Sequence, residues 1–525
     1  MHADTSFSCD NRLYTANIET TKENMDDSTE AYIENTIKNI DDSNDIILQN
    51  NMKIDNQITD VYLTKSQLCW CPTGKSKSYV NISHIIQVHY DQQKSDNDEI
   101  ELYPSQQFTV HYVIKLKQHK LKNCSLTFNT SDTKTCERWL KILKDKVKEF
   151  SHPKKLLVFI NPVGGRRQAQ RIYKEKVAPL FDLAKIVQTI IVTERQDHAK
   201  DFLNTEDLTS YDGVVSVGGD GMFSEVMNGV LKHNCGHHTV KLGANAKPIR
   251  LGIIPAGSTD TVVYCTTGTN DPTTSALHIL LGSSVSLDVC SVSSVDRFIK
   301  YSISLMGYGY FGDIIKDSDK LRWFGPNRYD IAGFKRFMKN KSYNGEVSFI
   351  QKLDHTKKLK CTAGCEQCST IYEEELESKE AFWQTVSGKF ISVIGANISC
   401  RCSRSSTGIS PHAHLGDGYI DLILVRKTTR AKYLHHLVKV ADKSLDNFNF
   451  NFIDVYRVKE FKFKSVTTSG DHNDNDGHAD CSRKINECNP TSSVWNIDGE
   501  LVEISDLHFK VHRQLITLYA LGIEE

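Results

Sequence analysis

Three short glycine-containing segments each follow an apolar run of the kind that forms a buried strand. They are residues 161–167, 217–225 and 254–260. Glycine lets the backbone approach a phosphate closely, and a helix that starts at such a turn directs its free N–H groups toward the anion. Parallel strands end at one edge of their sheet, where α/β proteins bind ligands. The pattern therefore predicts a phosphate site built from three turns.

Asp220 is the residue in these turns that needs a chemical explanation. It stands between Gly219 and Gly221, where phosphates would repel a carboxylate. A helix N-cap is the simpler interpretation, but glycines on both sides exceed what a cap requires. No G-x-x-x-x-G-K-[ST] or G-x-G-x-x-G pattern is present, which disfavours P-loop NTPases and dinucleotide-binding dehydrogenases.

Length and composition narrow the class of protein. The 525 residues are enough for two or three domains, and the net charge of -1 argues against nucleic acid as a partner. We find no apolar run long enough to span a bilayer, and the acidic N-terminus does not resemble a signal peptide. The 15 cysteines then indicate a reducing compartment in which most are free thiols.

The hydrophobic pattern predicts a multidomain α/β plus β protein with four segments. Residues 1–50 are polar and acidic, and we expect them to be disordered. Residues 51–150 contain short strands and a closing helix around Trp139, which resembles a pleckstrin-homology domain; a generic β domain is the alternative. Residues 151–286 alternate strands with helices, as in a parallel sheet. Residues 287–525 contain mainly strands, as in an antiparallel β-sandwich, with a mobile loop at 465–493.

The chain resembles the diacylglycerol kinase-like lipid kinases, a group that includes sphingosine and ceramide kinases. The shared blocks are residues 161–165, 218–225 and 255–260. Residues 306–313, 410–418 and the C-terminal 520–525 resemble ceramide kinases in particular, and the likeness runs from about residue 55 to the end.

The resemblance implies ATP- and Mg²⁺-dependent phosphorylation of the primary hydroxyl of ceramide, giving ceramide 1-phosphate. It also implies a cytoplasmic protein that is peripheral on Golgi or plasma membranes. Diacylglycerol or a sphingoid base remains an alternative substrate, and a catalytically inactive lipid-binding adaptor is an alternative of another class. Intact glycine turns around Asp220 argue against the adaptor.

The resemblance also assigns roles to individual residues. Asp220 is the expected general base, because a carboxylate at a helix N-terminus stays ionised and can accept the hydroxyl proton. The expected substrate-binding residues are Gly218, Gly219, Asp220, Gly221, Asp313 and Ile315. The expected nucleotide-binding residues are Asn161, Pro162, Val163, Gly164, Gly165, Thr193, Glu194, Arg195, Glu225, Gly257, Ser258, Thr259, Arg322, Arg328, Asp498, Gly499 and Glu500. Surface charge is the alternative for the two arginines, and an acidic Mg²⁺ role is expected at residues 498–500.

Ile315 bears on the choice of lipid. Sphingosine kinases use a carboxylate to meet the ammonium of sphingosine, and Ile315 stands at the matching position. An apolar residue gives an ammonium no partner, which favours the uncharged amide of ceramide. A shifted alignment would let Asp313 serve instead.

Cysteine spacing suggests a metal site, and a run of lysines suggests a site for lipid headgroups. Cys361, Cys365 and Cys368 have metal-like spacing, and Cys400 with Cys402 could complete four thiolates for Zn²⁺; redox-sensitive or buried thiols are the alternative. Lysines in the N-terminal β domain could face anionic lipid headgroups, with a solvated strand edge as the alternative: Lys115, Lys117, Lys120 and Lys122. A basic helix at 433–443 would be the Ca²⁺–calmodulin site that the resemblance implies, although a packing helix fits the pattern better.

Overall fold

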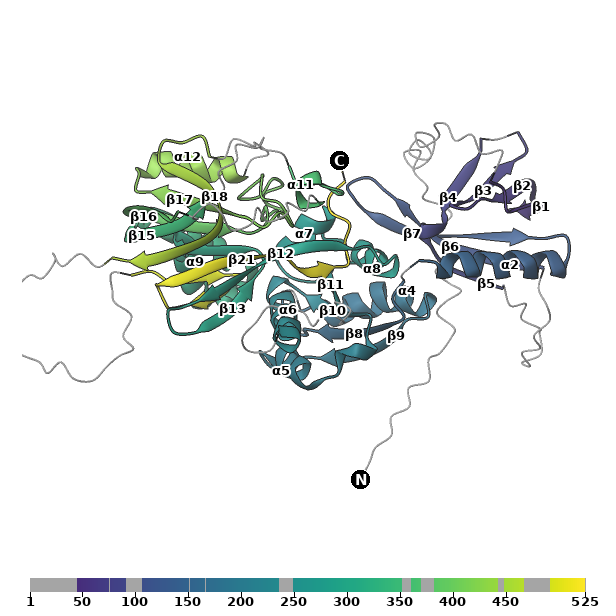
Figure 1. The fold of residues 1–525 in the computed structure, drawn as a ribbon, viewed down its shortest axis with the longest axis horizontal. Helices are drawn as coiled ribbons and strands as arrows, with labels where there is room; N and C mark the ends of the chain where they lie inside the picture. The colour runs from purple at the N-terminus through teal and green to yellow at the C-terminus, as the bar shows by residue number, and fades with distance from the viewer. Residues whose placement is uncertain are drawn as a thin grey trace, which may run out of the picture. The chain divides into compact units, whose positions relative to one another are not determined.

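The structure is a computed structural model, and it describes residues 45–74, 76–90, 106–150, 152–165, 167–235, 249–351, 360–369, 382–441, 448–466 and 492–524. The predicted disordered N-terminus lies outside these residues as far as residue 44, and the predicted mobile loop lies outside them from 467 to 491. The chain divides into two compact units (Figure 1). One comprises Met1–Lys117 and Asn123–Val147, and the other comprises Gln118–Lys122 and Lys148–Glu525.

The first unit is a seven-stranded sheet closed by one helix. Its strand order is β4-β3-β2-β1-β7-β6-β5. The strands are β1 (Leu48–Ile54), β2 (Gln57–Leu63), β3 (Gln67–Pro72), β4 (Ser78–Asn81), β5 (Ile85–Tyr90), β6 (Gln107–Lys115) and β7 (Leu121–Asn129). The start of β1 falls inside the segment that we expected to be disordered. The predicted β domain with a C-terminal helix is confirmed.

The helix α2 (Thr133–Lys148) closes this unit through one apolar face. Cys136, Trp139, Leu140 and Leu143 are buried, and their spacing places them on one side of the helix. The Trp139 indole N–H donates to Asn50 Oδ1 at 2.8 Å, so the polar tip of the buried ring has a partner.

The second unit begins with a parallel sheet. Its strands run in the order β9-β8-β10-β11, with bounds β8 (Lys155–Ile160), β9 (Val187–Val192), β10 (Gly213–Gly218) and β11 (Arg250–Pro255). Every residue of β10 is buried, as expected for a central strand covered on both faces. The connecting helices are α3 (Ala169–Ile172), α4 (Ala178–Leu183), α5 (His198–Thr205), α6 (Asp220–Cys235), α7 (Thr261–Thr267) and α8 (Pro272–Leu280). A π-helical stretch, Tyr173–Val177, joins α3 to α4.

The antiparallel part continues the same hydrogen-bonded sheet. The strand β21 (Leu507–Leu518) pairs with β11 in parallel and with β12 and β18 in antiparallel fashion. The remaining strands are β12 (Val285–Ser293), β13 (Phe298–Ser302), β14 (Leu305–Gly309), β15 (Tyr343–Gln351), β16 (Gln384–Ala396), β17 (Ile420–Arg426), β18 (Ile453–Ser465), β19 (Trp495–Ile497) and β20 (Glu500–Val502). The expected division between residues 286 and 287 falls within β12 and stays a prediction.

Two long strands make this part a closed, sandwich-like structure. Both β16 and β18 pair with β15 along one section and with β17 along another. The four strands therefore close around an apolar core, which includes Phe349, Phe390 and Phe461. This agrees with the predicted β-sandwich.

Helices in this part were largely missed by the sequence prediction. They are α9 (Tyr310–Asp319), η6 (Arg322–Asn327), α10 (Arg328–Lys339), α11 (Glu366–Ser369) and α12 (Arg430–Ala441), of which only α12 was expected. Gly312, Gly325 and Pro326 interrupt the pattern and resemble loop signals. None of the helices in the described part of the chain is long and apolar enough to span a bilayer.

Candidate active site

The three glycine turns lie together at the carboxyl edge of the parallel sheet, as predicted. The strands β8 and β11 flank β10, so the turns that follow them are neighbours. The backbone N–H of Asn161 donates to Val217 at 3.0 Å, and that of Ala256 donates to Gly218 at 2.9 Å. These bonds extend the hydrogen bonding between neighbouring strands into the turns that follow them.

Glycine is required where the turns touch. A Cβ atom on Gly165 would lie 2.5 Å from the Ala256 carbonyl oxygen, and one on Gly257 would lie 2.5 Å from the Gly219 Cα. Gly165 also has a φ of 56°, which favours glycine. Outside this contact the turns are open, because a Cβ on Gly221 would meet nothing within 4 Å and the residues Ser258 and Thr259 are exposed. The edge can therefore admit a phosphate to backbone N–H groups.

Asp220 begins α6 and holds the first turn of α7. Its carboxylate accepts the backbone N–H groups of Thr261 and Val262, each at 3.0 Å. Burial raises the pKa of Asp220, and the charge of Asp498 adds to this, while the two N–H groups lower it. Each carboxylate oxygen accepts one of these bonds and has a second lone pair for another proton donor.

Asp260 is a second acid in this site, and the sequence analysis gave it no role of its own. Its Oδ1 accepts the Gly257 N–H at 2.9 Å, and its backbone is left-handed, with a φ of 52°. Burial and the charge of Asp220 raise the pKa of Asp260 to about 7. Its place at the end of the third glycine turn was the signal that could have identified it. The site thus contains a buried carboxylate, Asp260, that interacts with the partly buried carboxylate of Asp220.

Several predicted nucleotide residues are engaged in holding the backbone. Asn161 Oδ1 accepts the N–H groups of Val163 at 3.0 Å and Gly164 at 2.9 Å, which shapes the first turn around Pro162. The Thr193 hydroxyl donates to Ile160 at 3.3 Å. These contacts position the turn and the end of β9.

Glu225 and the 194–195 segment lie at the start of α5. Glu225 Oε1 accepts the Ala199 N–H at 2.8 Å, and burial raises the pKa of this carboxyl. The Glu194 N–H donates to His198 Nδ1 at 3.1 Å, and Arg195 pairs with Asp201 at 2.7 Å. Glu225 therefore acts as a cap for α5 in this structure.

The 498–500 turn joins β19 to β20, as its Asp-Gly sequence predicted. The Asp498 carboxylate is buried and accepts four bonds, from Ser302 Oγ at 3.0 Å, Ile303 N at 3.0 Å, and the Ser304 N and Oγ at 2.8 and 2.6 Å. Glu500 pairs with Lys300 at 2.6 Å, and Gly499 has a φ of 88°. These donors hold Asp498 in place as a structural brace, with Oδ2 accepting a single bond, and the acidic Mg²⁺ role expected for this turn stays a prediction.

The predicted phosphate-binding arginines lie on η6 and α10. The Arg328 guanidinium lies 4.6 Å from the centroid of the Tyr329 ring and donates to its hydroxyl at 2.6 Å. The side chain of Arg322 lies outside the described part of the structure.

Asp313 is fully engaged inside the protein. Its carboxylate contacts Arg336 Nη1 at 3.2 Å, the Ser493 hydroxyl at 2.7 Å and the Tyr343 hydroxyl. The adjoining cavity measures about 10 Å³, which is room for one water molecule at most. Ile315, one half-turn further along α9, is half-buried. Asp313 therefore has no free oxygen to offer a lipid ammonium.

The three predicted cysteines lie together, but their fourth neighbour differs from the expectation. Cys361, Cys365 and Cys368 gather around His414. Cys400 donates instead to the Ile398 carbonyl at 3.3 Å, and Cys402 forms an isolated bridge with Ser405. His414 lies 46 residues beyond Cys368, so no local spacing in the sequence pointed to it as a ligand.

Family models match three consecutive parts of the chain. The model of the ceramide kinase PH domain matches residues 48–143, that of the diacylglycerol kinase catalytic domain residues 155–292, and that of the ceramide kinase C-terminal domain residues 303–525. Joined to the glycine turns around Asp220, these matches define a diacylglycerol kinase-like lipid kinase with an N-terminal pleckstrin-homology domain.

Relatives that match about four fifths of the chain identify the family within this class. Ceramide kinase from Homo sapiens is 44% identical, with 80% of this chain and 83% of that protein covered. Ceramide kinase from Arabidopsis thaliana is 32% identical, with 79% and 81% covered. A solved diacylglycerol kinase from Bacillus anthracis str. Sterne matches with a TM-score of 0.44 and 13% identity, over 70% of this chain and 97% of that one. This chain belongs to the ceramide kinase family.

Proposed function

We propose that the protein transfers the γ-phosphoryl group of ATP to the primary hydroxyl of ceramide, giving ceramide 1-phosphate. Relatives named ceramide kinases, at 44% and 32% identity, support the substrate. The observation that carries the proposal is the position of Asp220, a partly buried carboxylate at the meeting point of three glycine turns. An inactive adaptor would have no need of this arrangement.

Asp220 is the proposed general base. Its pKa is raised by burial, which makes it a better proton acceptor than an exposed aspartate. The bonds from Thr261 and Val262 hold the carboxylate in one orientation. In this arrangement it would accept the proton of the ceramide hydroxyl as the oxygen attacks phosphorus.

The glycine turns are the proposed ATP phosphate site, with the nucleotide-binding residues named above around it. Asp260 fits a divalent cation, because one carboxylate oxygen is held by Gly257 and the other accepts no hydrogen bond from a described residue. Mg²⁺ prefers such hard oxygen ligands, and when bound it would neutralise charge on the transferring phosphate.

The surroundings of Asp313 and Ile315 on α9 favour an uncharged lipid as the substrate. Asp313 is paired with Arg336, and Ile315 is apolar, so this region offers no anion to a sphingoid ammonium. This argument favours ceramide over sphingosine. It does not separate ceramide from diacylglycerol, which is also uncharged, and the named relatives favour ceramide.

An apolar surface on η6 and α10 is the proposed contact with the membrane. Trp323 on η6 is 77% exposed, and Phe334 on α10 is 67% exposed. Ile331 and Met338, also on α10, are exposed as well. Lys335 and Lys339, which directly follow Phe334 and Met338 in sequence, are also exposed. Apolar and cationic side chains together suit an anionic lipid surface, and a lipid kinase must reach its substrate there.

The N-terminal domain is the proposed second membrane contact. Lys115, Lys117, Lys120 and Lys122 are all exposed, as an anionic headgroup site requires. Together the two surfaces would place the protein on the cytosolic face of a membrane. We do not extend the proposal to calmodulin, because Tyr433 and His436 of α12 are buried in the apolar core and would have to leave it.

A lipid substrate panel tests the proposal. The purified full-length protein is assayed with radiolabelled ATP and Mg²⁺ in mixed micelles of ceramide, diacylglycerol or sphingosine. We expect phosphate transfer to ceramide to exceed transfer to the other two. Preferred transfer to diacylglycerol or sphingosine would replace the substrate, and no transfer to any lipid would support an adaptor.

A further inference from the structure

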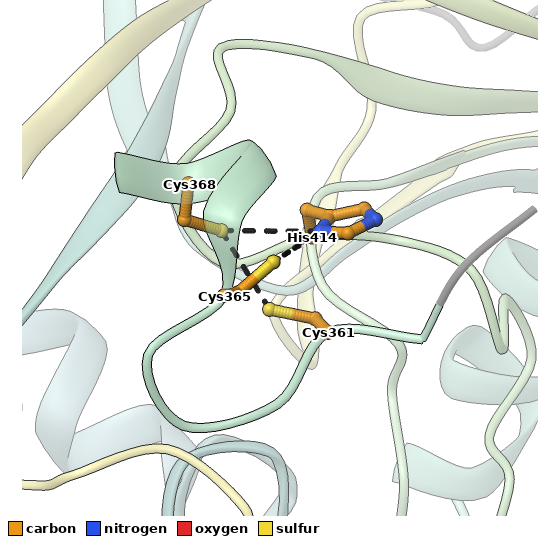
Figure 2. A group of neighbouring side chains, drawn as sticks. All are labelled: Cys361, Cys365, Cys368 and His414. Atoms are coloured by element: carbon orange, nitrogen blue, oxygen red, sulfur yellow. Dashed lines mark hydrogen bonds between the residues drawn. The ribbon is translucent and has the colours of Figure 1, made fainter. Parts of the chain in front are cut away.

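Three cysteines and one histidine form a compact cluster outside the glycine turns (Figure 2). Cys361, Cys365 and Cys368 come from the segment 360–369, and His414 comes from the loop between β16 and β17. Their ligand atoms all lie within 4.8 Å of one another. Three of the separations are 3.2 Å from Cys365 Sγ to His414 Nδ1, 3.6 Å from Cys361 Sγ to Cys368 Sγ, and 3.9 Å from Cys368 Sγ to His414 Nδ1.

These separations match the edges of a tetrahedral zinc site. Zn–S bonds of about 2.3 Å and a Zn–N bond of about 2.0 Å place neighbouring ligand atoms about 3.5–3.8 Å apart. A disulfide would instead need sulfur atoms about 2.05 Å apart. We infer that Cys361, Cys365, Cys368 and His414 bind one Zn²⁺ ion as a structural Cys₃His site.

The surroundings of the sulfurs are those of metal-bound thiolates. The Leu415 N–H donates to Cys361 Sγ at 3.4 Å, and the Gly416 N–H points to Cys368. Backbone donors of this kind hold ligand sulfurs and balance their charge. Cys365 and Cys368 lie at the two ends of one helical turn, with the Cys368 N–H donating to the Cys365 carbonyl at 3.2 Å. This turn presents both sulfurs to the same point.

The ligand set indicates a structural role. Four protein ligands complete a tetrahedron and leave no open position for a substrate, whereas catalytic zinc keeps one open. His414 is only 2% exposed, and none of the four ligands belongs to the glycine turns.

The metal would fasten three parts of the second unit. The Ala363 N–H donates to Ile523 at 2.7 Å, and the Gln514 side chain donates to the Cys368 carbonyl at 2.6 Å. The Gly522 N–H in turn donates to Thr266 at 3.0 Å, on the helix whose first turn holds Asp220. The segment 360–369 contains only the four-residue α11 as regular structure, so it has few backbone bonds of its own. A zinc ion would therefore secure this segment against β21 and the C-terminal residues.

Metal content tests the inference without reference to kinase activity. The full-length protein, purified under reducing conditions, is analysed for zinc by elemental mass spectrometry and by release to a chromogenic chelator. Variants Cys361→Ser and His414→Ala remove one ligand each. His414→Cys keeps four ligands, and Cys402→Ser is the matched control, a partly buried cysteine near in sequence but outside the cluster. Substitution with Co²⁺ reports the ligand set by absorption.

We expect about one zinc per chain in the wild type and in Cys402→Ser, and tetrahedral thiolate–cobalt absorption in both. Cys361→Ser and His414→Ala should lower zinc affinity at least 10–100-fold, the loss typical even of residues that only support a ligand. His414→Cys should retain zinc with a changed cobalt spectrum, which separates a lost ligand from a lost fold. A wild type without bound zinc after incubation with the metal would overturn the inference, as would equal zinc loss in Cys402→Ser. A Cys361–Cys368 disulfide that persists in the protein purified under reducing conditions would overturn it in favour of a redox pair.

Discussion

The carboxylate of Asp220 accepts the backbone N–H of Val262 at 3.0 Å, so an acid of α6 caps a different helix, α7. Its other oxygen accepts the N–H of Thr261 at 3.0 Å. The proposed base is thus also the residue that fixes the third glycine turn beside the first two. Removing the side chain must therefore affect stability as well as chemistry.

Asp220→Ala should destabilise the second unit more than Asp220→Asn. Alanine leaves two partly buried N–H groups without their acceptor, at up to about 1–3 kcal/mol each, whereas the asparagine oxygen still accepts one bond. Urea unfolding of both variants measures the difference. Asp201→Asn, at an exposed ion pair on α5, is the control and should change stability little. Equal stability of the alanine and asparagine variants would contradict the capping role.

The free energy of unfolding should fall as pH rises from about 4 to 7 through the contribution of two buried acids. Burial raises the pKa of Asp260 and of Asp288 to about 7 each. In this window the folded chain keeps protons that the unfolded chain has released, so increasing pH favours unfolding.

Asp260→Asn should remove part of this pH dependence. Its amide oxygen can still accept the Gly257 N–H, so the turn is kept while the titration is lost. Unfolding by urea at pH 5 and pH 7.5 should show a smaller loss of stability in the variant than in the wild type, by on the order of 1 kcal/mol per unit of raised pKa. Equal losses of stability in the variant and in the wild type would contradict this prediction.

Ile315→Asp should raise phosphorylation of sphingosine relative to ceramide. The new carboxylate would pair with the sphingoid ammonium, and a close ion pair in a partly buried site contributes on the order of tenfold or more. Ile315→Asn is the matched control, because it adds polarity without charge. The ratio of kcat/KM for the two lipids is measured. An unchanged ratio in Ile315→Asp would show that the lipid headgroup lies elsewhere.

Trp323→Ser and Phe334→Ser should weaken binding to phosphatidylserine-containing vesicles. Burying a large apolar side chain contributes about 1.5–3 kcal/mol, so each change should lower partitioning roughly tenfold or more. Val295→Ser is the control, since Val295 is 93% exposed on the turn between β12 and β13, outside this surface. Vesicle co-sedimentation makes the comparison, and an equal effect of all three changes would remove η6 and α10 from the membrane contact.

Sequence reasoning predicted the elements whose pattern is local and strong. The buried runs before the glycine turns became β8, β10 and β11, and the amphipathic spacing around Trp139 became α2. The meeting of the three turns also followed, because parallel strands end at one edge. Sequence reasoning could not show that the turns touch closely enough to require glycine at position 257.

Relations between distant residues were not predictable from spacing. The pairing of Asp313 with Arg336 depends on α9 and α10, whose glycines and exposed apolar residues obscured the helical pattern. Asp498 and Glu225 were expected at the nucleotide, and the sequence did not show that each also accepts hydrogen bonds from remote segments. His414 joined the cysteines through a loop contact that leaves no trace in the sequence.

Separating ATP binding from phosphoryl transfer in Asp220→Asn tests the central claim most directly. The variant and the wild type are compared by equilibrium binding of ATP and by transfer of radiolabelled phosphate to ceramide. We predict ATP affinity within a few-fold of the wild type and a fall in kcat of about 10²–10⁴, the contribution of a general base. A variant that binds ATP and keeps more than about a tenth of the wild-type rate would contradict the assignment of Asp220 as the base.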